Sequence, residues 1–431
     1  MKLQSRWTET RLKYLCRIVG GGTPAKENLE FWNGYIPWVS PKDMGAFYVS
    51  DAEDHITTEA VAASATQIVP KGSVIVVVRS GILRHTIPVA VTTRHVAINQ
   101  DMKALIAHGQ IMPEYLAFLI VANQDRFLGQ WRREGTTVES IEMELLANCP
   151  CPTPPAHEQH CIVELLSREI PKIDDLIAKK QRLIDLLEEK RVAQINRAVT
   201  QGINPSAAMK DSQIDWLGNV PDHWNVAPLY ARFEVQLGKM LDARAITGEC
   251  LAPYLRNIDV QWDRVDVSNL PTMDFDAQDR NRFRLLVGDL LVCEGGESGR
   301  SAIWQGELAE CYYQKALHRL RPRRKDLARF LMYALQVAVN IGVFRAGSNQ
   351  NTIDHLTADK LRRHRFAFPP AAEQAGIVAH LDNYKAKHLS ATEALQETIT
   401  RLREYRAALI TAAVTGQLDL RKHEKQMEAI A

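Results

Sequence analysis

Two stretches of the chain carry apolar or small residues at alternating spacings of three and four, which is typical of helices that pair through one face. In the C-terminal stretch these positions are Leu381, Tyr384, His388, Ala391, Leu395, Thr398, Leu402, Tyr405, Leu409 and Ala412. In the central stretch they are Leu166, Ile173, Leu176, Leu183 and Leu187. Because each stretch follows its own globular segment, the pattern favours two long helices paired as an antiparallel coiled coil. The alternative is that each helix packs only on its own domain.

The two helical stretches are copies of one another, displaced by 215 residues. Residues 154–159 are Pro-Pro-Ala-His-Glu-Gln, and residues 369–374 are Pro-Pro-Ala-Ala-Glu-Gln. Without a gap, 19 of the 47 positions from 154 to 200 are identical in the second copy. A diproline is compatible with a helix start. Pro171 has no counterpart, since Ala386 stands there, and it should kink or break the first helix near Ser167.

The segments outside the repeat have a mixed α/β pattern. Apolar runs at residues 74–78 and 290–293 follow glycine-containing turns and predict buried strands, while residues 115–122 and 327–339 predict short apolar helices. The predicted fold class is therefore α+β, with two similar α/β domains separated and joined by two long helices that pair as an antiparallel coiled coil. We expect domains at residues 1–150 and 211–368 and helices at residues 151–203 and 369–420, with a linker at residues 201–212.

The composition is that of an ordinary globular protein, with 46% hydrophobic and 24% charged residues among 431, and it argues against a disordered chain. No apolar run approaches the ~18 residues of a membrane span. The first residues show no apolar secretory segment. Seven cysteines without CxxC spacing indicate reduced thiols rather than a zinc site. These features predict a cytoplasmic protein that does not associate with membranes.

Sequence motifs of the common catalytic sites are missing. The chain has no G-x-x-x-x-G-K-[ST] phosphate loop, and no H-E-x-x-H, G-x-S-x-G or EF-hand pattern. It also lacks the [DN]-P-P-[YF] tetrad on which amino-methyltransferases depend. We therefore expect no catalytic residues, no metal site and no cofactor on this chain.

Basic residues cluster, although the net charge is only +2, from 53 basic and 51 acidic residues. One cluster holds Arg79, Arg84, His85 and Arg94, and a second holds Arg126, Arg132 and Arg133. Residues 315–329 contain seven basic residues and one acid, and Lys360, Arg362, Arg363 and Arg365 follow. Such patches supply phosphate contacts to nucleic acid, although each could equally be a solvated face.

Reading a DNA sequence requires amide and guanidinium groups at the base edges. Asn99 and Gln100 follow the first basic cluster, and residues 348–352 are Ser-Asn-Gln-Asn-Thr. Arg84 and Arg300 lie in glycine-containing loops and could pair with guanine. The complete set of candidate DNA-binding residues is Thr23, Lys42, Arg79, Ser80, Arg84, His85, Arg94, Asn99, Gln100, Arg132, Arg133, Thr136, Lys239, Arg256, Arg300, Arg323, Arg324, Ser348, Asn349 and Asn351.

A set of short motifs extends over almost the whole chain. In the first half they are residues 21–24 (Gly-Gly-Thr-Pro), Trp32, residues 36–44 (Ile-Pro-Trp-Val-Ser-Pro-Lys-Asp-Met), residues 79–84 and residues 135–141. In the second half they are residues 216–218 (Trp-Leu-Gly), Pro221, Trp224 and residues 353–357, and the Pro-Pro-x-x-Glu-Gln motif precedes both helices. Through these motifs together the chain resembles the specificity subunit of type I restriction-modification systems.

The resemblance implies that each globular domain is a target-recognition domain reading one half of a split sequence in double-stranded DNA. It implies that the helices form a spacer, and that methyltransferase (modification) and restriction/translocase subunits dock on the chain. S-adenosylmethionine, ATP and Mg²⁺ are then expected on those partners.

Two other functions compete with a non-catalytic DNA-reading subunit. The first is a self-sufficient DNA methyltransferase or nuclease, which the missing catalytic tetrad disfavours. The second is a coiled-coil adaptor that does not bind DNA, which the basic, amide-bearing loops disfavour. A DNA-binding assay with a salt titration separates the adaptor from the reader.

Overall fold

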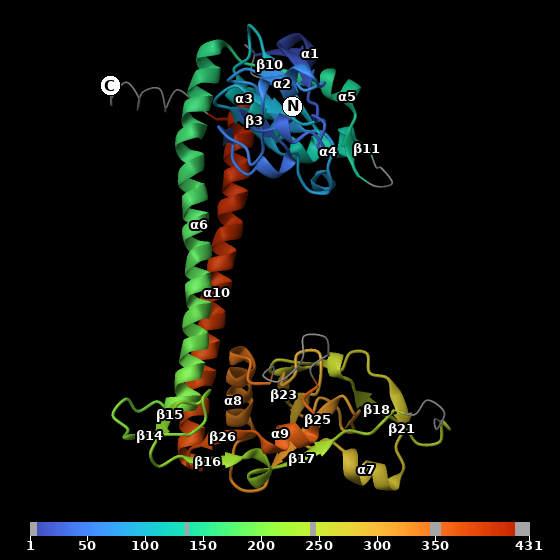
Figure 1. The fold of residues 1–431 in the computed structure, drawn as a ribbon, viewed down its shortest axis with the longest axis vertical. Helices are drawn as coiled ribbons and strands as arrows, with labels where there is room; N and C mark the ends of the chain where they lie inside the picture. The colour runs from blue at the N-terminus through green and yellow to red at the C-terminus, as the bar shows by residue number, and fades with distance from the viewer. Residues whose placement is uncertain (1–6, 134–137, 242–246, 345–354, 419–431) are drawn as a thin grey trace. The chain divides into compact units, whose positions relative to one another are not determined.

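The computed structural model describes residues 7–133, 138–241, 247–344 and 355–418. The chain divides into two units, one formed by Met1–Gln181 with Gln396–Ala431 and the other by Arg182–Leu395. Each unit combines one globular domain with a part of each long helix (Figure 1). None of the helices within the described ranges is long and apolar enough to cross a membrane.

The first globular domain alternates short strands and short helices before the first long helix. Its elements are β1 (Thr8–Arg11), α1 (Leu12–Leu15), β2 (Cys16–Gly20), η1 (Leu29–Phe31), β3 (Trp32–Val39), η2 (Pro41–Asp43), β4 (Tyr48–Val49), β5 (His55–Ile56), α2 (Thr58–Ala62), β6 (Ile68–Val69), β7 (Val74–Val77), η3 (Gly81–Arg84), β8 (Val89–Thr92), β9 (Val96–Ile98), β10 (Met102–Ala107), α3 (Pro113–Ala122), α4 (Gln124–Trp131), β11 (Arg132–Arg133), β12 (Ser140–Ile141), α5 (Met143–Ala147), β13 (Pro150–Thr153) and α6 (Ala156–Gln201).

The second globular domain leads into the second long helix in the same way. Its elements are β14 (Met209–Asp211), β15 (Asn219–Pro221), β16 (Asn225–Pro228), η4 (Leu229–Ala231), β17 (Phe233–Leu237), β18 (Leu251–Leu255), η6 (Asn257–Asp259), β19 (Val260–Gln261), β20 (Arg264–Val265), β21 (Thr272–Asp274), α7 (Ala277–Phe283), β22 (Leu290–Cys293), β23 (Ser301–Ile303), β24 (Tyr312–Tyr313), β25 (Leu317–Pro322), α8 (Ala328–Ile341), α9 (Ala358–Arg363), β26 (Arg365–Phe368) and α10 (Ala371–Val414).

The two domains share one sheet plan. The strand order is β2-β10-β7-β8-β4 in the first and β17-β25-β22-β23 in the second. Strands β10 and β25, strands β13 and β26, and helices α3 and α8 all begin 215 residues apart, so the repeat extends well beyond the long helices. The predicted buried strands are β7 and β22, and the predicted apolar helices are α3 and α8. The prediction of two similar α/β domains is confirmed.

The Glu-Gln pair of the repeated motif fastens each domain to its long helix. In the first domain the Gln159 amide donates to the Pro154 and Gln110 carbonyls and accepts from the Met112 N–H, each at 2.8 Å. The preceding Glu158 accepts the Trp7 indole N–H at 2.8 Å. In the second domain Glu373 accepts the Trp224 indole at 3.0 Å. The motif therefore marks a buried joint.

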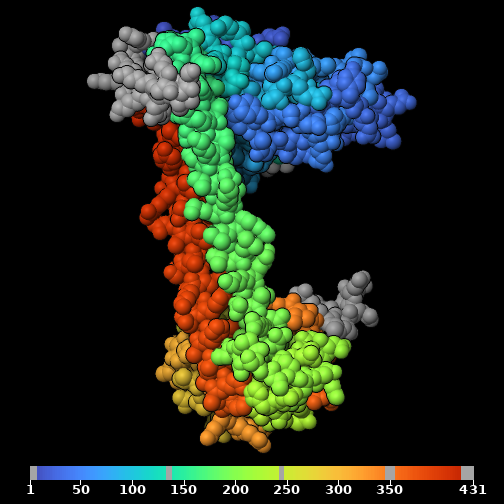
Figure 2. Space-filling model, turned by 90° about the vertical axis from the view of Figure 1, so that its left-hand side faces the viewer, coloured from blue at the N-terminus to red at the C-terminus, as the bar shows by residue number. Residues whose placement is uncertain are grey.

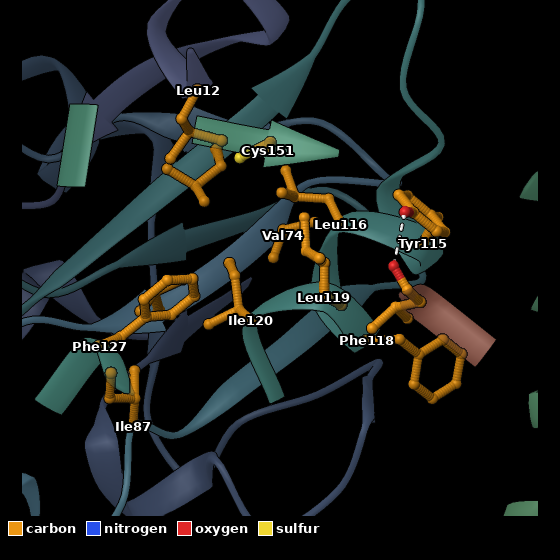
Figure 3. Packing of buried hydrophobic residues seen from close by; sticks show 14 of the residues in the cluster. Leu12, Val74, Ile87, Tyr115, Leu116, Phe118, Leu119, Ile120, Phe127 and Cys151 are labelled. Carbon is orange, nitrogen blue, oxygen red and sulfur yellow. Dashed lines mark hydrogen bonds between the residues drawn. The ribbon is translucent and has the colours of Figure 1, made fainter. Parts of the chain in front are cut away.

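An apolar core holds α3 between the sheet and the long helices of the first unit. Leu116, Leu119 and Ile120 pack toward Val74 of β7 (Figure 3). The Tyr115 hydroxyl donates to the Pro152 carbonyl at 3.0 Å and lies 3.3 Å from the Val414 carbonyl of α10. Full burial of this ring contributes about 1.5–3 kcal/mol, as for other large side chains.

The long helices α6 and α10 pack against each other in both units (Figures 1 and 2). In the first unit the Arg406 Nε donates to the Asp174 carboxylate at 2.8 Å. In the second unit the His388 Nε2 lies 3.5 Å from the Glu188 carboxylate. The contact position falls along α10 as it rises along α6, so the helices are antiparallel. The predicted antiparallel pairing is confirmed.

The predicted seam was partly wrong. Leu166 and Ile173 are buried and Leu187 is half-buried, but Leu176 and Leu183 are 46% and 45% exposed. On α10, Ala391 and Tyr405 also face solvent. The half-buried positions include Ile177, Lys180, Ile184, Thr392 and Arg406. An undistorted helix has 3.6 residues per turn, so a contact stripe drifts away from a strict 3.5-residue repeat.

The predicted break near Ser167 was also wrong. Helix α6 runs without interruption from Ala156 to Gln201 with Pro171 inside it. A proline in a helix interior costs about 3 kcal/mol, because it removes one hydrogen bond and crowds the preceding turn. Burial of Ile170 and Ile173 on either side offsets this cost, since both belong to the core of the first unit.

Candidate nucleic-acid interface

The structure gathers four predicted DNA-binding residues of the first domain on one surface, the Arg79 patch: Arg79, Arg84, His85 and Arg132, all exposed. The loop after β7 carries the first three, and strand β11 carries Arg132. The two segments meet through β12, since the Ser80 N–H donates to the Glu139 carbonyl at 3.1 Å and Arg132 pairs with Ile141. Residues about fifty positions apart thus form one basic surface.

Glu139 lies inside the Arg79 patch and orders it. Its carboxylate, 8% exposed, accepts from the Arg84 Nε at 2.5 Å. This hydrogen bond raises the pKa of Arg84 and lowers that of Glu139. The Ser80 hydroxyl accepts the Ile82 N–H at 3.4 Å and so caps η3. Ser80 therefore has a structural use in the loop that presents Arg84.

The other candidates of the first domain lie elsewhere, and several have partners within it. Asn99 is 5% exposed, and its side chain closes a turn with Asp101, so the prediction of a base-reading amide there was wrong. The Thr23 hydroxyl donates to the exposed Gln100. Lys42 pairs with Glu53 at 2.9 Å and Asp54 at 3.0 Å, which raises its pKa. The Arg94 guanidinium is exposed and lies 3.4 Å from the Tyr35 carbonyl.

The glycines before Thr23 serve close packing. A Cβ on Gly21 would lie 1.9 Å from the Asn99 carbonyl oxygen, and one on Gly238 would lie 2.2 Å from the Gln314 carbonyl oxygen. The two glycines stand at the same place, immediately after β2 and β17. Only a residue without Cβ allows such an approach of two backbones.

In the second domain three predicted cations are bound internally. Lys239 pairs with Asp279. Arg256 binds Asp259 through two hydrogen bonds of 2.9 and 2.8 Å. The Arg300 Nε and Nη2 donate to the Val260 and Asn257 carbonyls at 2.9 and 3.0 Å, so this edge of the guanidinium is turned inward rather than toward a guanine.

The basic run at residues 315–329 does not form one surface. Strand β25 is flanked by β17 and β22, so Arg319 is 4% exposed and donates to the Arg282 carbonyl at 3.0 Å. Arg321 is engaged by buried Asp289 at 2.5 Å. The turn after β25 leaves Arg323, Arg324 and Lys325 exposed, while Lys315 is exposed at the other end of the strand.

The side chains of five candidate DNA-binding residues lie outside the described part of the chain. Thr136, Ser348, Asn349 and Asn351 lie outside the described residues. Arg133 belongs to β11, but its side chain also lies outside the described part.

Equivalent loops of the two domains differ in charge. The loop after β22 stands where the Arg79 loop stands after β7, and the register of both strands makes Glu294 the counterpart of Val78. Residues 79–84 contain two arginines and no acid, whereas the loop after β22 carries Glu294 and Glu297. Glu297 in this loop accepts the Trp262 indole at 3.1 Å. The loop lies beside the chain at Leu356, whose N–H donates to the Glu294 carbonyl at 2.7 Å. Alignment of the two loops through the repeated strands is the signal that could have identified this difference in charge.

The described residues contain no group of three or more His, Cys, Asp or Glu side chains that could hold a metal ion. What the exposed groups offer is charge and hydrogen bonding. Exposed guanidinium groups suit phosphate oxygens or guanine edges, and a half-buried carboxylate such as that of Glu294 suits the amino group of cytosine.

Comparison with known proteins gives a consistent result. The model of the type I restriction modification DNA specificity domain matches residues 4–186 and 233–401. The specificity subunit of the type I restriction enzyme EcoR124I/EcoR124II from Escherichia coli is 43% identical over 150 residues, 35% of this chain and 37% of that protein. The MjaIX specificity subunit from Methanocaldococcus jannaschii is 28% identical over 194 residues, 44% and 42% of the two chains. These alignments thus span less than half of either relative.

Two solved structures share the fold. A chain from work on complex assembly and conformational transition of the type I R-M system superposes with a TM-score of 0.73 at 17% identity, covering 97% of this chain and all of that one. The HsdS subunit from Thermoanaerobacter tengcongensis superposes with a TM-score of 0.58 at 17% identity, covering 97% and 99%.

Proposed function

The chain belongs to the family of type I restriction modification DNA specificity proteins, and from this we propose that it is the DNA-reading subunit of a type I restriction-modification complex. Each globular domain reads one half of a bipartite target in double-stranded DNA. The paired helices set the unread gap between the halves. The chain itself performs no chemistry.

The observation that carries this proposal is that one domain fold occurs twice in the chain with different charged residues in equivalent loops. One sheet plan occurs twice, and the equivalent loops differ in charge, since the loop after β7 carries Arg79 and Arg84 and the loop after β22 carries Glu294 and Glu297. A guanidinium and a carboxylate favour different base edges, because the first only donates hydrogen bonds and the second only accepts them. Two domains of this kind suit a target whose halves differ in sequence.

The proposed partners follow from the resemblance to specificity subunits, and the missing catalytic motifs of the sequence agree with them. Methyltransferase subunits would carry S-adenosylmethionine, and restriction/translocase subunits would carry ATP and Mg²⁺. The paired helices α6 and α10 offer a long surface on which such subunits could dock.

The experiment is a map of N6-methyladenine in the DNA of cells that carry this chain with its methyltransferase partner. We expect a split sequence with two defined halves and a fixed gap. Methylation at one uninterrupted sequence, or none that depends on this chain, would contradict the proposal.

Binding by the purified chain separates the competing functions. A DNA reader binds duplex with an affinity that falls linearly with salt on a double-logarithmic plot. An adaptor shows no such binding, and a self-sufficient enzyme modifies or cuts the duplex without partners when S-adenosylmethionine or Mg²⁺ is added.

A further inference from the structure

The central sheet of each domain has one face toward the long helices and one face away from them. In the second domain, Leu290 and Val292 face the core that contains α8 and α10, whereas Leu291 and Cys293 face a separate core. We call the structure on this far face the outer layer. The hairpin of β19 and β20 belongs to it, since Val260 and Val265 lie in its core.

The tip of this hairpin nevertheless reaches the long helix. Asp263, at the turn, forms an ion pair with Arg329 of α8, with a second bond of 3.0 Å, and another with Lys385 of α10. Arg329 also binds Asp382 of α10 at 2.8 Å, and Asp382 accepts from the Tyr333 hydroxyl. Four charged groups therefore connect the outer layer, α8 and α10.

Asp263 has an unfavourable backbone conformation, which indicates that its contacts with Arg329 and Lys385 hold it in place. Its φ is 56°, in the left-handed region that costs a non-glycine residue roughly 1–3 kcal/mol. Asp263 is 16% exposed and Arg329 25% exposed, so water screens their interaction only in part. Burial disfavours the charged guanidinium, but the bonds to Asp382 and Asp263 outweigh this and raise the pKa of Arg329.

The first domain makes the same contact with different chemistry. The capping boxes Ser40–Asp43 and Arg256–Asp259 lie 216 residues apart and align the outer layers of the two domains. In this alignment Phe47 of the first domain corresponds to Asp263 of the second. The 215-residue offset of the helices gives the other equivalents, and Arg329, Tyr333, Asp382 and Lys385 correspond to Glu114, Phe118, Ser167 and Ile170.

At that place Phe47 stacks on Phe118, with ring centroids 4.3 Å apart and an interplanar angle of 17°. Phe118 and Ile170 belong to the same apolar core. An aromatic stack thus connects the outer layer to α3 in the first domain, where four charged side chains do so in the second.

We propose that Asp263, Arg329, Asp382 and Lys385 form a positioning joint that holds the outer layer of the second domain in fixed register with α10, and thereby sets where its half-site is read relative to the gap. This inference rests on the proposed function. The joint requires charge, so salt weakens it, whereas the Phe47 stack in the first domain does not depend on ionic attraction.

Two substitutions test the joint in the full-length chain. Asp263→Asn removes the charge and keeps a residue type that tolerates a left-handed backbone. Arg329→Met removes the guanidinium and keeps an unbranched side chain. The matched control is Glu114→Gln, which changes a carboxylate at the equivalent place in the first domain, where the structure gives it no ion pair among the described residues.

The first measurement is hydrogen exchange in the free protein at the amides of Asp263 and Asp266, which donate to the Ser301 carbonyl at 3.0 Å and to the Asp259 carbonyl at 2.8 Å. Both joint variants should exchange faster there than the wild type, and Glu114→Gln should not. Unchanged exchange in both joint variants would overturn the proposal without any assumption about DNA.

The second measurement is binding to duplexes that carry the mapped target with the native gap, or with a gap one base pair shorter or longer. The wild type should prefer the native gap, and the joint variants should lose about fivefold of this preference, the size of coupling within one contact network. A merely destabilised domain would weaken binding to all three duplexes equally, which would overturn the proposal. If the wild type binds no DNA, the proposed function fails, and only the exchange result stands.

Discussion

Replacement of Gln374 by alanine should destabilise the second domain, because Gln374 of the repeated Glu-Gln motif fastens this domain to α10. Gln374 is fully buried, and its amide accepts from the Leu327 N–H at 2.8 Å. It donates to the Pro369 carbonyl at 2.9 Å and to the Asp326 carboxylate at 2.8 Å. Neutral hydrogen bonds contribute about 1 kcal/mol each, and one to a charged group about 1.5–3 kcal/mol, so the loss should be about 4 kcal/mol.

The variant Gln374→Glu distinguishes the hydrogen bond that the Gln374 side chain accepts from the two that it donates. The introduced carboxyl can still accept from Leu327, but it meets the Asp326 carboxylate and the Pro369 carbonyl with acceptors. Two buried carboxylates at one place raise the pKa of one of them, so this variant should gain stability as the pH falls. An acid whose pKa is raised in the folded state destabilises the protein only at pH values above its pKa in the unfolded state, which is about 4.3 for glutamate. The free energy of unfolding of this variant should therefore rise as the pH falls toward that value.

Gln159→Glu is the matched control, because there both amide protons go to backbone carbonyls, those of Pro154 and Gln110. It should be destabilised with a weaker dependence on pH, since no second carboxylate is present. The assay is urea unfolding between pH 5 and pH 8, with hydrogen exchange to assign the loss to the correct domain. A loss below about 1 kcal/mol for Gln374→Ala, or equal pH dependence of the two glutamate variants, would refute the reasoning.

Three further predictions concern DNA. Charge reversal at Arg323 and Arg324 should weaken binding to all sequences and reduce the salt slope by about one unit per lost phosphate contact; an unchanged slope would place both on a solvated face. Replacement of residues 1–150 by the equivalent segment of a relative should change one half-site only in a methylation map, and a change in both would contradict independent readers. Insertion of four residues near Lys180 adds about one turn, ~6 Å, and should lengthen the gap by one to two base pairs while both half-sites stay the same. Full activity with an unaltered gap would show that the helices do not set the spacing.

The sequence alone determined the architecture, because the signals were local or repeated. The runs at β7 and β22 are apolar at every position, as a strand covered on both faces must be. The 215-residue repeat identified the joint motif before its contacts were known. The seam was less certain, since Leu176 and Tyr405 fit a 3.5-residue repeat but face solvent on helices of 3.6 residues per turn.

Only the tertiary structure decided which side chains are available to DNA. Arg319 and Arg321 lie in the same basic run as Arg323, yet strand β25 is central in its sheet and turns them toward partners in the domain. Arg300 is occupied by the Val260 carbonyl forty residues away. Whether a basic side chain is exposed depends on contacts with residues that are distant in the sequence. The pattern of charges along the chain does not show which of these residues come together in the fold.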